Sequence, residues 1–375
     1  MNAVTRPRGH RSSRSRGPLS LLRTWVAPDV FDFWASHLHP TWSWNRPLAR
    51  IVDRQAQSRD AVTLVLQPNR HWQGFRPGQH VNLGIEIDGV RMTRSYSLSD
   101  APRADGRIAV TVKHIEGGRL SRHLCQDARV GDIVDLGQAF GDMTWPQGAD
   151  GAWLFLAAGS GITPLMSLLR AHAVKGMPTP LTLLYWARTR DELCFVDELR
   201  ALAKQHPQFV VHFVLTREAA LSEGERAGRI DAALLSSLVP DIAQRGVYAC
   251  GPGGFVASAR ALAAGQARSF AAEAFTPPPR ADRESAIEDG GHVEVTLAAS
   301  GRTLSVPRGQ SLLTALEDQG LKLASGCRMG ICNTCACGKV SGTTRHLHTG
   351  DAIGEPVSAL RLCVNAATSD LVLDL

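Results

Sequence analysis

The sequence predicts a multidomain protein in which an antiparallel β-barrel is followed by an α/β domain with a parallel sheet and by a small β-grasp module. Residues 46–147 predict the barrel because short β-prone runs are separated there by turn signals. Residues 148–275 predict the α/β domain because buried strands alternate with helical stretches. A hairpin-like pair, a short helix and a cysteine-rich loop indicate the β-grasp module over 292–375. Prolines, glycines and charges mark 276–291 as a linker, and residues 1–45 precede the barrel.

Runs of apolar and β-branched residues locate the individual strands. In the barrel they cover residues 62–66, 108–112 and 133–136. In the α/β domain they cover residues 153–158, 181–186, 209–215 and 246–250. In the last module the expected elements are strands at 293–297 and 303–306 and a helix around 311–319.

Length and charge restrict the class of protein. A chain of 375 residues holds two or three domains, and none of its apolar runs is long enough to span a bilayer. The net charge of +6 comes from an N-terminal arm with six arginines and no acidic residue before Asp29. These arginines are Arg6, Arg8, Arg11, Arg14, Arg16 and Arg23. The remaining 35 basic and 35 acidic residues balance, which argues against a nucleic-acid-binding body.

The arm itself is expected to be disordered, and it lacks the apolar core of a secretion signal. We therefore expect a cytoplasmic protein. The arm is either a solvated tail or a contact for anionic lipid at the inner face of the membrane or for an acidic partner.

Residues 25–44 contain half of the tryptophans: Trp25, Trp34, Trp42 and Trp44. One interpretation is a helix packed on the first domain. The other is a surface for a membrane or a membrane-bound partner, because tryptophan favours boundaries between water and apolar material.

Four cysteines have the spacing C-x4-C-x2-C, with twenty-seven residues between the third and the fourth. They are Cys327, Cys332, Cys335 and Cys363. This spacing is typical of plant-type [2Fe–2S] sites, in which four thiolates hold the cluster. Gly326 and Gly330 allow the backbone to curl closely around inorganic sulfur. The alternatives are a zinc site, which usually has two short knuckles, and disulfides, which suit small secreted domains. Cys337 does not fit the spacing and is expected to be a spare thiol.

A candidate flavin site begins with the sequence Arg94-Ser95-Tyr96-Ser97 at the end of an expected strand. A flavin requires a cation for its pyrophosphate, an aromatic surface for its ring, and a hydroxyl or amide near N5. This stretch offers all three. Residues 117–121, Gly-Gly-Arg-Leu-Ser, open a helix whose N–H groups and Ser121 hydroxyl could hold a phosphate. An ordinary N-capped helix explains the second stretch equally simply.

A candidate nucleotide site follows the strand at 153–158. Gly159, Gly161 and Thr163 belong to a loop of small residues that lets the backbone approach a pyrophosphate, although a β–α turn without a ligand has the same composition. Arg188 and Arg190 follow the next strand and could grip the 2′-phosphate of NADPH. The adjacent acidic residues 191 and 192 would weaken that grip, and a solvated charged loop is the alternative. We expect NADPH in preference to NADH.

With these motifs, residues 46–375 resemble the ferredoxin–NADP reductase superfamily, and specifically its fused reductases that feed oxygenases, hydroxylases and desaturases. The resemblance implies that Arg94 binds flavin phosphate, Tyr96 stacks on the ring and Ser97 lies near N5. It implies that the pyrophosphate is lined by Gly118, Leu120 and Ser121. It favours FAD over FMN, because the Gly-Gly-x-Leu-Ser-x-x-Leu pattern is similar to that of the FAD members.

The resemblance also places the turn of Cys250, Gly251 and Pro252 beside the nicotinamide. Without the resemblance, Cys250 is simply a buried cysteine. Tyr96, Ser97 and Cys250 would then be the residues at the reacting atoms, where alignment matters more than acid or base chemistry.

The expected function is an NAD(P)H-dependent reductase that passes electrons through FAD and the [2Fe–2S] cluster to an oxygen-activating partner. The tryptophan-rich segment resembles reductases of membrane fatty-acyl desaturases. A soluble Rieske oxygenase, a diiron hydroxylase and a cytochrome P450 are alternative acceptors. A non-catalytic redox-sensing module is the alternative from a different class. The charge of residues 292–375, seven basic and seven acidic, does not choose among these partners.

Overall fold

The computed structural model describes residues 27–148, 150–275, 291–326, 328, 330, 333–347 and 350–375. The arm, Trp25, most of the expected linker, Cys327 and Cys332 therefore lie outside the described residues. The chain divides into two units, Met1–Arg46 and Pro47–Leu375. In the described part, no helix is long and apolar enough to cross a membrane.

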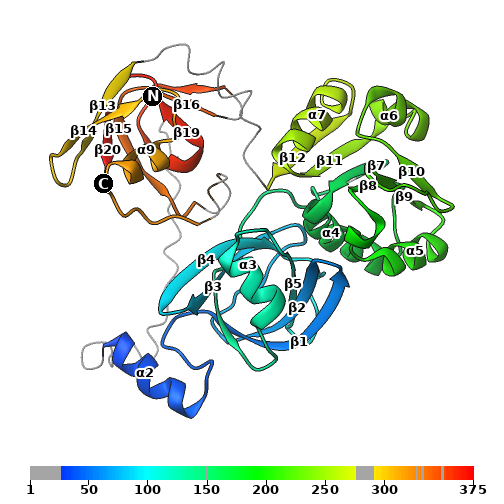
Figure 1. Ribbon diagram of the computed structural model, residues 1–375, viewed down its shortest axis with the longest axis horizontal. Helices are drawn as coiled ribbons and strands as arrows, with labels where there is room; N and C mark the ends of the chain where they lie inside the picture. Colours follow the sequence, from blue (N-terminus) through cyan, green and yellow to red (C-terminus); the bar gives the residue numbers. More distant parts are fainter. Residues whose placement is uncertain are drawn as a thin grey trace, which may run out of the picture. The chain divides into compact units, whose positions relative to one another are not determined.

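In the first unit, helix α2 (Pro28–Leu38) confirms the expected helix (Figure 1). It begins with a proline, which suits the first helical turn. One side of the helix packs against Trp44 in the loop that follows it. The Phe31 ring lies edge-on to the Trp44 ring at 5.1 Å, and Asp32 Oδ1 accepts the Trp44 backbone N–H at 2.5 Å. The outer side is apolar. Its exposed residues, with Trp42 from the following loop, are Val30, Phe33, Trp34, Leu38 and Trp42. The tryptophan-rich segment therefore packs on itself through one side and exposes the other.

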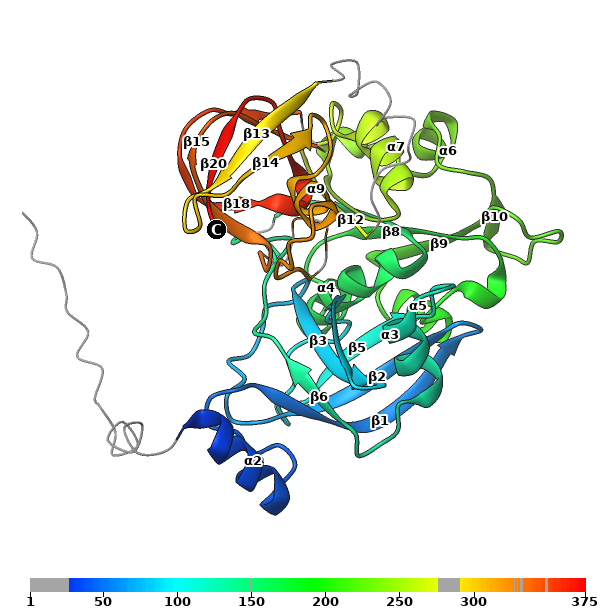
Figure 2. The same ribbon diagram turned by 60° about the vertical axis from the view of Figure 1, so that its left-hand side comes forward.

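Six antiparallel strands form the expected barrel, in the order β4–β3–β6–β1–β2–β5 (Figure 2). They are β1 (Leu48–Ser58), β2 (Ala61–Pro68), β3 (His80–Ile87), β4 (Val90–Ser97), β5 (Ile108–Lys113) and β6 (Ile133–Leu136). A bridge between Leu98 and Val110 joins the end of β4 to β5 and closes the barrel, so that neither edge strand is left open there. Helix α3 (Arg119–Arg122) continues into a π-helical turn, His123–Asp127, and contributes Leu120 to the barrel core.

A six-stranded parallel sheet forms the α/β domain, in the order β10–β9–β8–β7–β11–β12. Its strands are β7 (Trp153–Ala158), β8 (Leu181–Ala187), β9 (Phe209–Leu215), β10 (Glu225–Ala227), β11 (Gly246–Gly251) and β12 (Ser269–Ala274). Helices α4 (Ile162–Val174) and α5 (Val196–Gln205) cover one face, and α6 (Ala232–Leu238) and α7 (Gly253–Ala263) cover the other (Figure 1). Consequently β7 is apolar throughout: Phe155 and Ala157 pack on the first pair, and Leu154 and Leu156 on the second.

The strand order reverses between β7 and β11. In open parallel sheets, ligands bind outside the carboxyl ends of the strands at such a point. The loop after β7 and the turn after β11 are therefore the places where a nucleotide site is expected.

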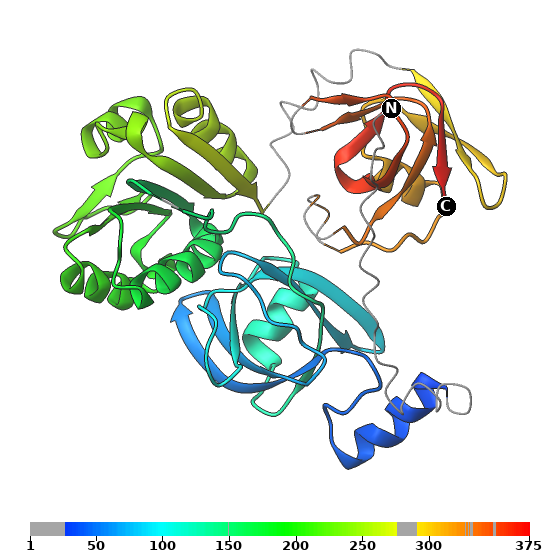
Figure 3. The same cartoon turned by 180° about the vertical axis from the view of Figure 1, so that it is seen from behind.

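The C-terminal module has a mixed five-stranded sheet, β14–β13–β20–β15–β18, and a small sheet, β17–β16–β19 (Figure 3). Its strands are β13 (His292–Leu297), β14 (Thr303–Pro307), β15 (Ala336–Ser341), β16 (Thr344–His346), β17 (Ala352–Ile353), β18 (Val357–Arg361), β19 (Asn365–Ala367) and β20 (Leu371–Asp374). Helix α9 (Leu312–Asp318) begins after Ser311, whose Oγ accepts the Thr314 N–H at 3.3 Å, and it packs Leu312 and Leu316 into the core. This arrangement confirms the β-grasp module.

Candidate functional site

Strand β4 carries the predicted flavin residues. Arg94 is exposed, and its Nη1 donates to the Thr93 carbonyl at 2.8 Å. Among the described residues no carboxylate forms an ion pair with Arg94, whereas Arg91 on the same strand pairs with Asp135 at 2.7 Å. Burial raises the pKa of the Tyr96 phenol, so the ring stays protonated and neutral. Ser97 is buried at the end of the strand. A cation, a neutral aromatic ring and a hydroxyl thus follow one another, and this set fits a flavin.

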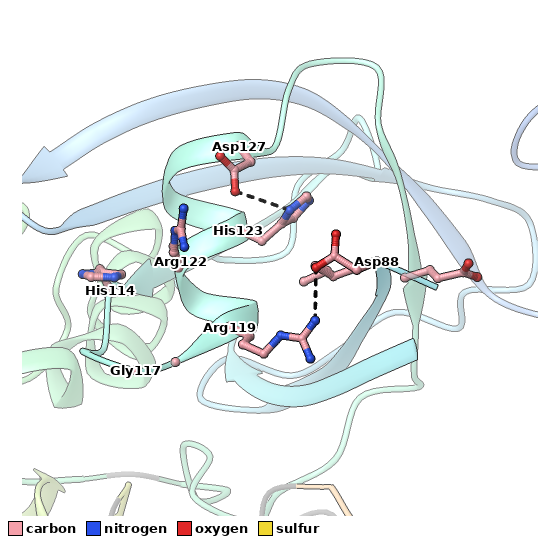
Figure 4. A pocket seen from close by; sticks show the side chains of 10 residues that line it. Asp88, His114, Gly117, Arg119, Arg122, His123 and Asp127 are labelled. Carbon is pink, nitrogen blue, oxygen red and sulfur yellow. Dashed lines mark hydrogen bonds and ion pairs between the residues drawn. The ribbon is translucent and has the colours of Figure 1, made fainter. Parts of the chain in front are cut away.

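A hollow of about 620 Å³ lies between the end of β3 and the loop leading into α3 (Figure 4). Figure 4 shows Arg119 directed at Asp88, with Nη2 to Oδ2 at 3.2 Å, and His123 directed at Asp127, with Nδ1 to Oδ2 at 3.7 Å. Basic and acidic groups are therefore mixed in this hollow beside Gly117 and Gly118, where the pyrophosphate is expected.

The residues of the predicted phosphate loop also stabilise the loop itself through internal contacts. The Ser121 hydroxyl donates to the Gly118 carbonyl at 3.1 Å and accepts the Ile115 N–H at 3.2 Å. A Cβ at Gly118 would lie 2.5 Å from Ser121 Oγ, so only glycine fits that position. Leu120 is buried in the barrel core. A short helix does begin here, but its N-cap residue Gly118 makes no side-chain capping hydrogen bond, and direct contact of these residues with a phosphate stays a prediction.

The loop after β7 and the turn after β11 meet backbone to backbone. Gly159 to Gly161 form one 3₁₀ turn before α4, and Gly159 has a φ of +55°. A Cβ at Gly161 would overlap the Cys250 carbonyl. The Thr163 hydroxyl donates to the Ser160 carbonyl at 2.9 Å and so stiffens the loop. The structure thus brings together the two motifs that the sequence assigned separately to the nucleotide.

Cys250 is fully buried on β11, between Ala157 of β7 and Glu273 of β12. Burial raises the pKa of its thiol well above the ordinary value, and the charge of Glu273 adds to the effect. Its Sγ lies 3.6 Å from Met143 Sδ. Cys250 is therefore a neutral thiol that can shape the site, and it is not prepared to act as a thiolate nucleophile.

The two arginines after β8 are bound by carboxylates of the chain. Arg188 Nε lies 2.9 Å from Glu192, and Arg190 Nη2 lies 2.6 Å from Glu225. Glu225 is buried, and its hydrogen bond with Arg190 lowers its pKa to about 2. Arg190 also donates to the Ala220 carbonyl at 2.9 Å, so it holds the segment before β10. These contacts resemble the charged-loop alternative. Arg188, whose side chain is 52% exposed, is the better candidate for a phosphate.

Sequence reasoning missed a buried polar pair beside Cys250 and Ser97. His80 Nε2, on β3, lies 3.1 Å from Glu273 Oε2, on β12, and the Phe275 ring meets His80 edge-on at 6.2 Å. A single histidine and a single glutamate give no motif, and the two residues belong to different domains. The nearest signal in the sequence is the turn at Pro77 and Gly78, which predicts that a strand begins shortly afterwards, at about His80.

The cluster loop is described at Arg328, at Gly330 and from Asn333 onward, and the backbone φ is positive at all three residues. The Gly330 N–H donates to Cys363 Sγ at 3.2 Å, and the Arg361 guanidinium donates to the Gly330 carbonyl at 2.6 Å. Cys335 and Cys363 are both buried. A backbone that curls around a sulfur and aims an amide at it fits a cluster held by thiolates. Burial and the Cys335 charge raise the pKa of Cys337 to about 12, in keeping with a spare thiol.

Comparison with known proteins identifies the three domains. Residues 48–145 match the oxidoreductase FAD-binding domain, residues 155–261 the oxidoreductase NAD-binding domain, and residues 295–367 the 2Fe-2S iron-sulfur cluster binding domain. These matches define the chain as a flavin- and iron–sulfur-dependent oxidoreductase.

An NADPH oxidoreductase of Mycobacterium tuberculosis is 35% identical over 356 residues, which cover 93% of this chain and 90% of the relative. A glycine betaine monooxygenase reductase subunit of Pseudomonas aeruginosa is 30% identical over 357 residues, covering 89% and 96%. Phthalate dioxygenase reductase, at 23% identity, shares the fold with a TM-score of 0.57 over 88% of this chain and 97% of its own.

The chain belongs to the ferredoxin–NADP reductase superfamily, in the branch with a fused 2Fe–2S domain. It is an NAD(P)H-dependent oxidoreductase in which FAD and a [2Fe–2S] cluster are the electron carriers.

Proposed function

We propose that this chain is the reductase component of a multicomponent oxygenase and that its cluster module delivers electrons to a separate terminal oxygenase. The observation that carries the proposal is the 2Fe–2S domain at residues 295–367, in a chain that already contains FAD- and NAD-binding domains. A carrier of single electrons is needed when the acceptor is another protein with a metal centre. The name of the Pseudomonas relative, a monooxygenase reductase subunit, supports the same role.

When bound, the cofactors convert a two-electron hydride from the nicotinamide into single electrons. In the proposed arrangement Arg94 binds flavin phosphate, Tyr96 supports the ring, and Ser97 lies near the reacting edge. The loop at 159–163 and the turn at 250–252 hold the nicotinamide, with Arg188 toward the 2′-phosphate. Cys327, Cys332, Cys335 and Cys363 hold the cluster.

The test separates the electron carriers. The purified holoprotein is mixed anaerobically with NADPH or NADH, and flavin bleaching and cytochrome c reduction are followed. Cys335→Ser should remove the cluster and cytochrome c reduction, while flavin reduction by the nucleotide persists. Cys337→Ser is the matched control, because Cys337 is a neighbouring buried cysteine outside the ligand spacing, and it should retain the cluster.

Loss of flavin reduction in a folded Cys335→Ser protein would contradict the proposed order of carriers. Slow turnover of the intact protein with every acceptor, including purified oxygenase components, would instead favour the redox-sensing module.

A second candidate, a membrane-bound acceptor such as a fatty-acyl desaturase, is favoured by the outer side of the first unit. Phe33, Trp34 and Trp42 are 59%, 65% and 55% exposed, and the arm that precedes them contains six arginines and no acidic residue. Aromatic rings beside positive charge suit the surface of an anionic membrane. If the acceptor is membrane-bound, we propose that the protein itself is cytoplasmic and contacts the membrane only peripherally.

Sedimentation with vesicles of anionic or neutral lipid tests the second candidate. Replacement of Phe33 and Trp34 by alanine should abolish binding to anionic vesicles. Replacement of Ile115, an exposed apolar residue of the barrel unit, should have no effect. Equal sedimentation of all proteins with both lipids would exclude a specific membrane contact and leave the soluble oxygenase.

A further inference from the structure

His80 and Glu273 form a buried contact between the barrel and the α/β domain. His80 is the first residue of β3 and is 3% exposed, and the Glu273 side chain on β12 is 12% exposed. Nε2 and Oε2 are 3.1 Å apart. Within the described residues, neither of these atoms nor His80 Nδ1 has a hydrogen bond of normal geometry.

Each member of the pair is the direct strand neighbour of a residue proposed to lie at the reacting atoms. In the strand register His80 is opposite Ser97, and Glu273 is opposite Cys250. The contact therefore connects β3, the strand paired with the one that ends at Ser97, with β12, the strand paired with the one that carries Cys250. A shift of one domain relative to the other would move Ser97 and Cys250 relative to each other.

The surroundings hold the histidine ring in one place. Phe140 stacks on His80 with centroids 5.9 Å apart and planes at 21°, and Phe275 meets it edge-on at 6.2 Å. A Cβ at Gly141 would lie 3.1 Å from His80 Nδ1, so a side chain at position 141 would crowd the ring. A polar pair taken out of water contributes little net stability, because desolvation offsets the attraction. Its defined geometry is the property that the site can use.

We propose that His80 is a positioning residue for hydride transfer, acting through Glu273 to align the domain that holds the flavin with the domain that holds the nicotinamide. The inference rests on the proposed roles of Ser97 and Cys250. In the step concerned, the C–H bond of the dihydronicotinamide breaks and the hydride carries both electrons to the flavin. His80 neither gives nor takes a proton in this step. Small losses of alignment lower the rate of such a step more than they lower nucleotide binding.

The experiment measures flavin reduction by anaerobic stopped flow with NADPH and with NADPH deuterated at the transferred position. His80→Phe keeps the ring stack and removes the polar atoms, His80→Gln keeps a donor, and Glu273→Gln keeps the shape and removes the charge. For His80→Phe and Glu273→Gln we expect the limiting rate to fall about 10-fold or more, with nucleotide affinity changed by less than about 3-fold. The isotope effect should differ from that of the wild type, which a merely structural change would not produce. The double variant should be no slower than the slower single variant, because the two residues act through one contact.

Lys113→Met is the matched control. Its Nζ joins the same two domains through Glu192 at 3.2 Å, and Asp60 is its other partner. Flavin content and melting temperature are measured for every variant. If one of His80→Phe and Glu273→Gln does not fold, the other tests the same contact from its opposite side. Because only flavin reduction is followed, the result does not depend on which protein accepts the electrons.

A wild-type rate and isotope effect in folded His80→Phe or Glu273→Gln would overturn the proposal. Rate losses that multiply in the double variant, or an equal loss in Lys113→Met, would also overturn it.

Discussion

Arg94 on β4 and Arg190 after β8 were both expected to bind phosphates, but they differ in the carboxylates that surround them. Arg94 is exposed and, within the described residues, has no carboxylate in an ion pair. Arg190 is bound by Glu225 at 2.6 Å and has Glu218 at 3.9 Å. An arginine that already binds a buried carboxylate must give up that contact before it can bind a ligand, whereas an unpaired one gains a partner. The carboxylates around an arginine therefore indicate its role better than its place in a motif.

The largest effect is expected at the unpaired arginine. Arg94→Ala should weaken FAD binding about 10- to 100-fold, because a hydrogen bond to a charged group contributes about 1.5–3 kcal/mol. Fluorescence titration of flavin-depleted protein measures the affinity. Arg91→Ala is the control, because Arg91 on the same strand already pairs with Asp135, and it should bind FAD nearly as the wild type does. Equal affinities of both variants would remove the contrast between Arg94 and Arg190.

Arg190→Ala should act on stability. Among the described residues, it leaves the buried Glu225 carboxylate with the Ser222 N–H as its remaining hydrogen-bond partner, at 2.8 Å, and should lower the free energy of unfolding. In the folded wild type Arg190 lowers the pKa of Glu225 from 4.5 to about 2. The stabilisation is therefore complete above pH 4.5 and is lost as the pH falls toward 2.

Urea unfolding at a series of pH values checks this sign. The curves for the wild type and Arg190→Ala should converge below pH 4.5. A difference that grows as the solution becomes more acidic would show that Arg190 stabilises the fold by another route.

Arg188 is intermediate, since it has one carboxylate partner and a half-exposed side chain. Arg188→Ala should raise the KM for NADPH about 10-fold, which corresponds to about 1.4 kcal/mol, and leave the KM for NADH unchanged. Steady-state cytochrome c reduction with each nucleotide measures both values. If Arg190→Ala produced the same selective loss, the distinction between the two arginines would be wrong.

The smallest effect is expected at Arg328, beside the cluster. Its guanidinium forms two hydrogen bonds to Glu317, at 2.7 and 2.9 Å, but its side chain is 50% exposed. Arg328→Ala should therefore change the free energy of unfolding by less than about 1 kcal/mol. The electron paramagnetic resonance spectrum of the reduced cluster should be unchanged. A lost or altered signal would mean that Arg328 shapes the cluster loop.

The strands that the sequence predicted are those with a continuous apolar or β-branched pattern. Residues 153–158, for example, coincide with β7 because both faces of that strand are covered. Two of the missed strands lack such a pattern. Strand β12 has the sequence Ser-Phe-Ala-Ala-Glu-Ala at the edge of the sheet and is only partly buried, and β10 is a charged segment of three residues.

Candidate site residues could be proposed from the sequence where short motifs carry them, as at residues 94–97, 159–163 and 250–252, and their contacts with cofactors stay predictions. The site was not predictable where residues distant in sequence meet. The partners of Arg190 lie 28 and 35 residues later, and the contact between His80 and Glu273 crosses two domains. Such contacts depend on the packing of the folded chain, and no local pattern reports them. The aromatic side of α2 illustrates the same limit, because the pattern did not say which rings would be exposed, and packing of this helix on the first domain stays a prediction.

The fit of Gly161 against the Cys250 carbonyl has a consequence for engineering this enzyme. The loop after β7 and the turn after β11 are far apart in the chain, but they share one surface with no room for a single added carbon. If only one segment were replaced by that of another reductase, its backbone would be shaped to fit a different partner segment and would clash with the one left unchanged. The two segments should therefore be transplanted together, as a single replaceable part.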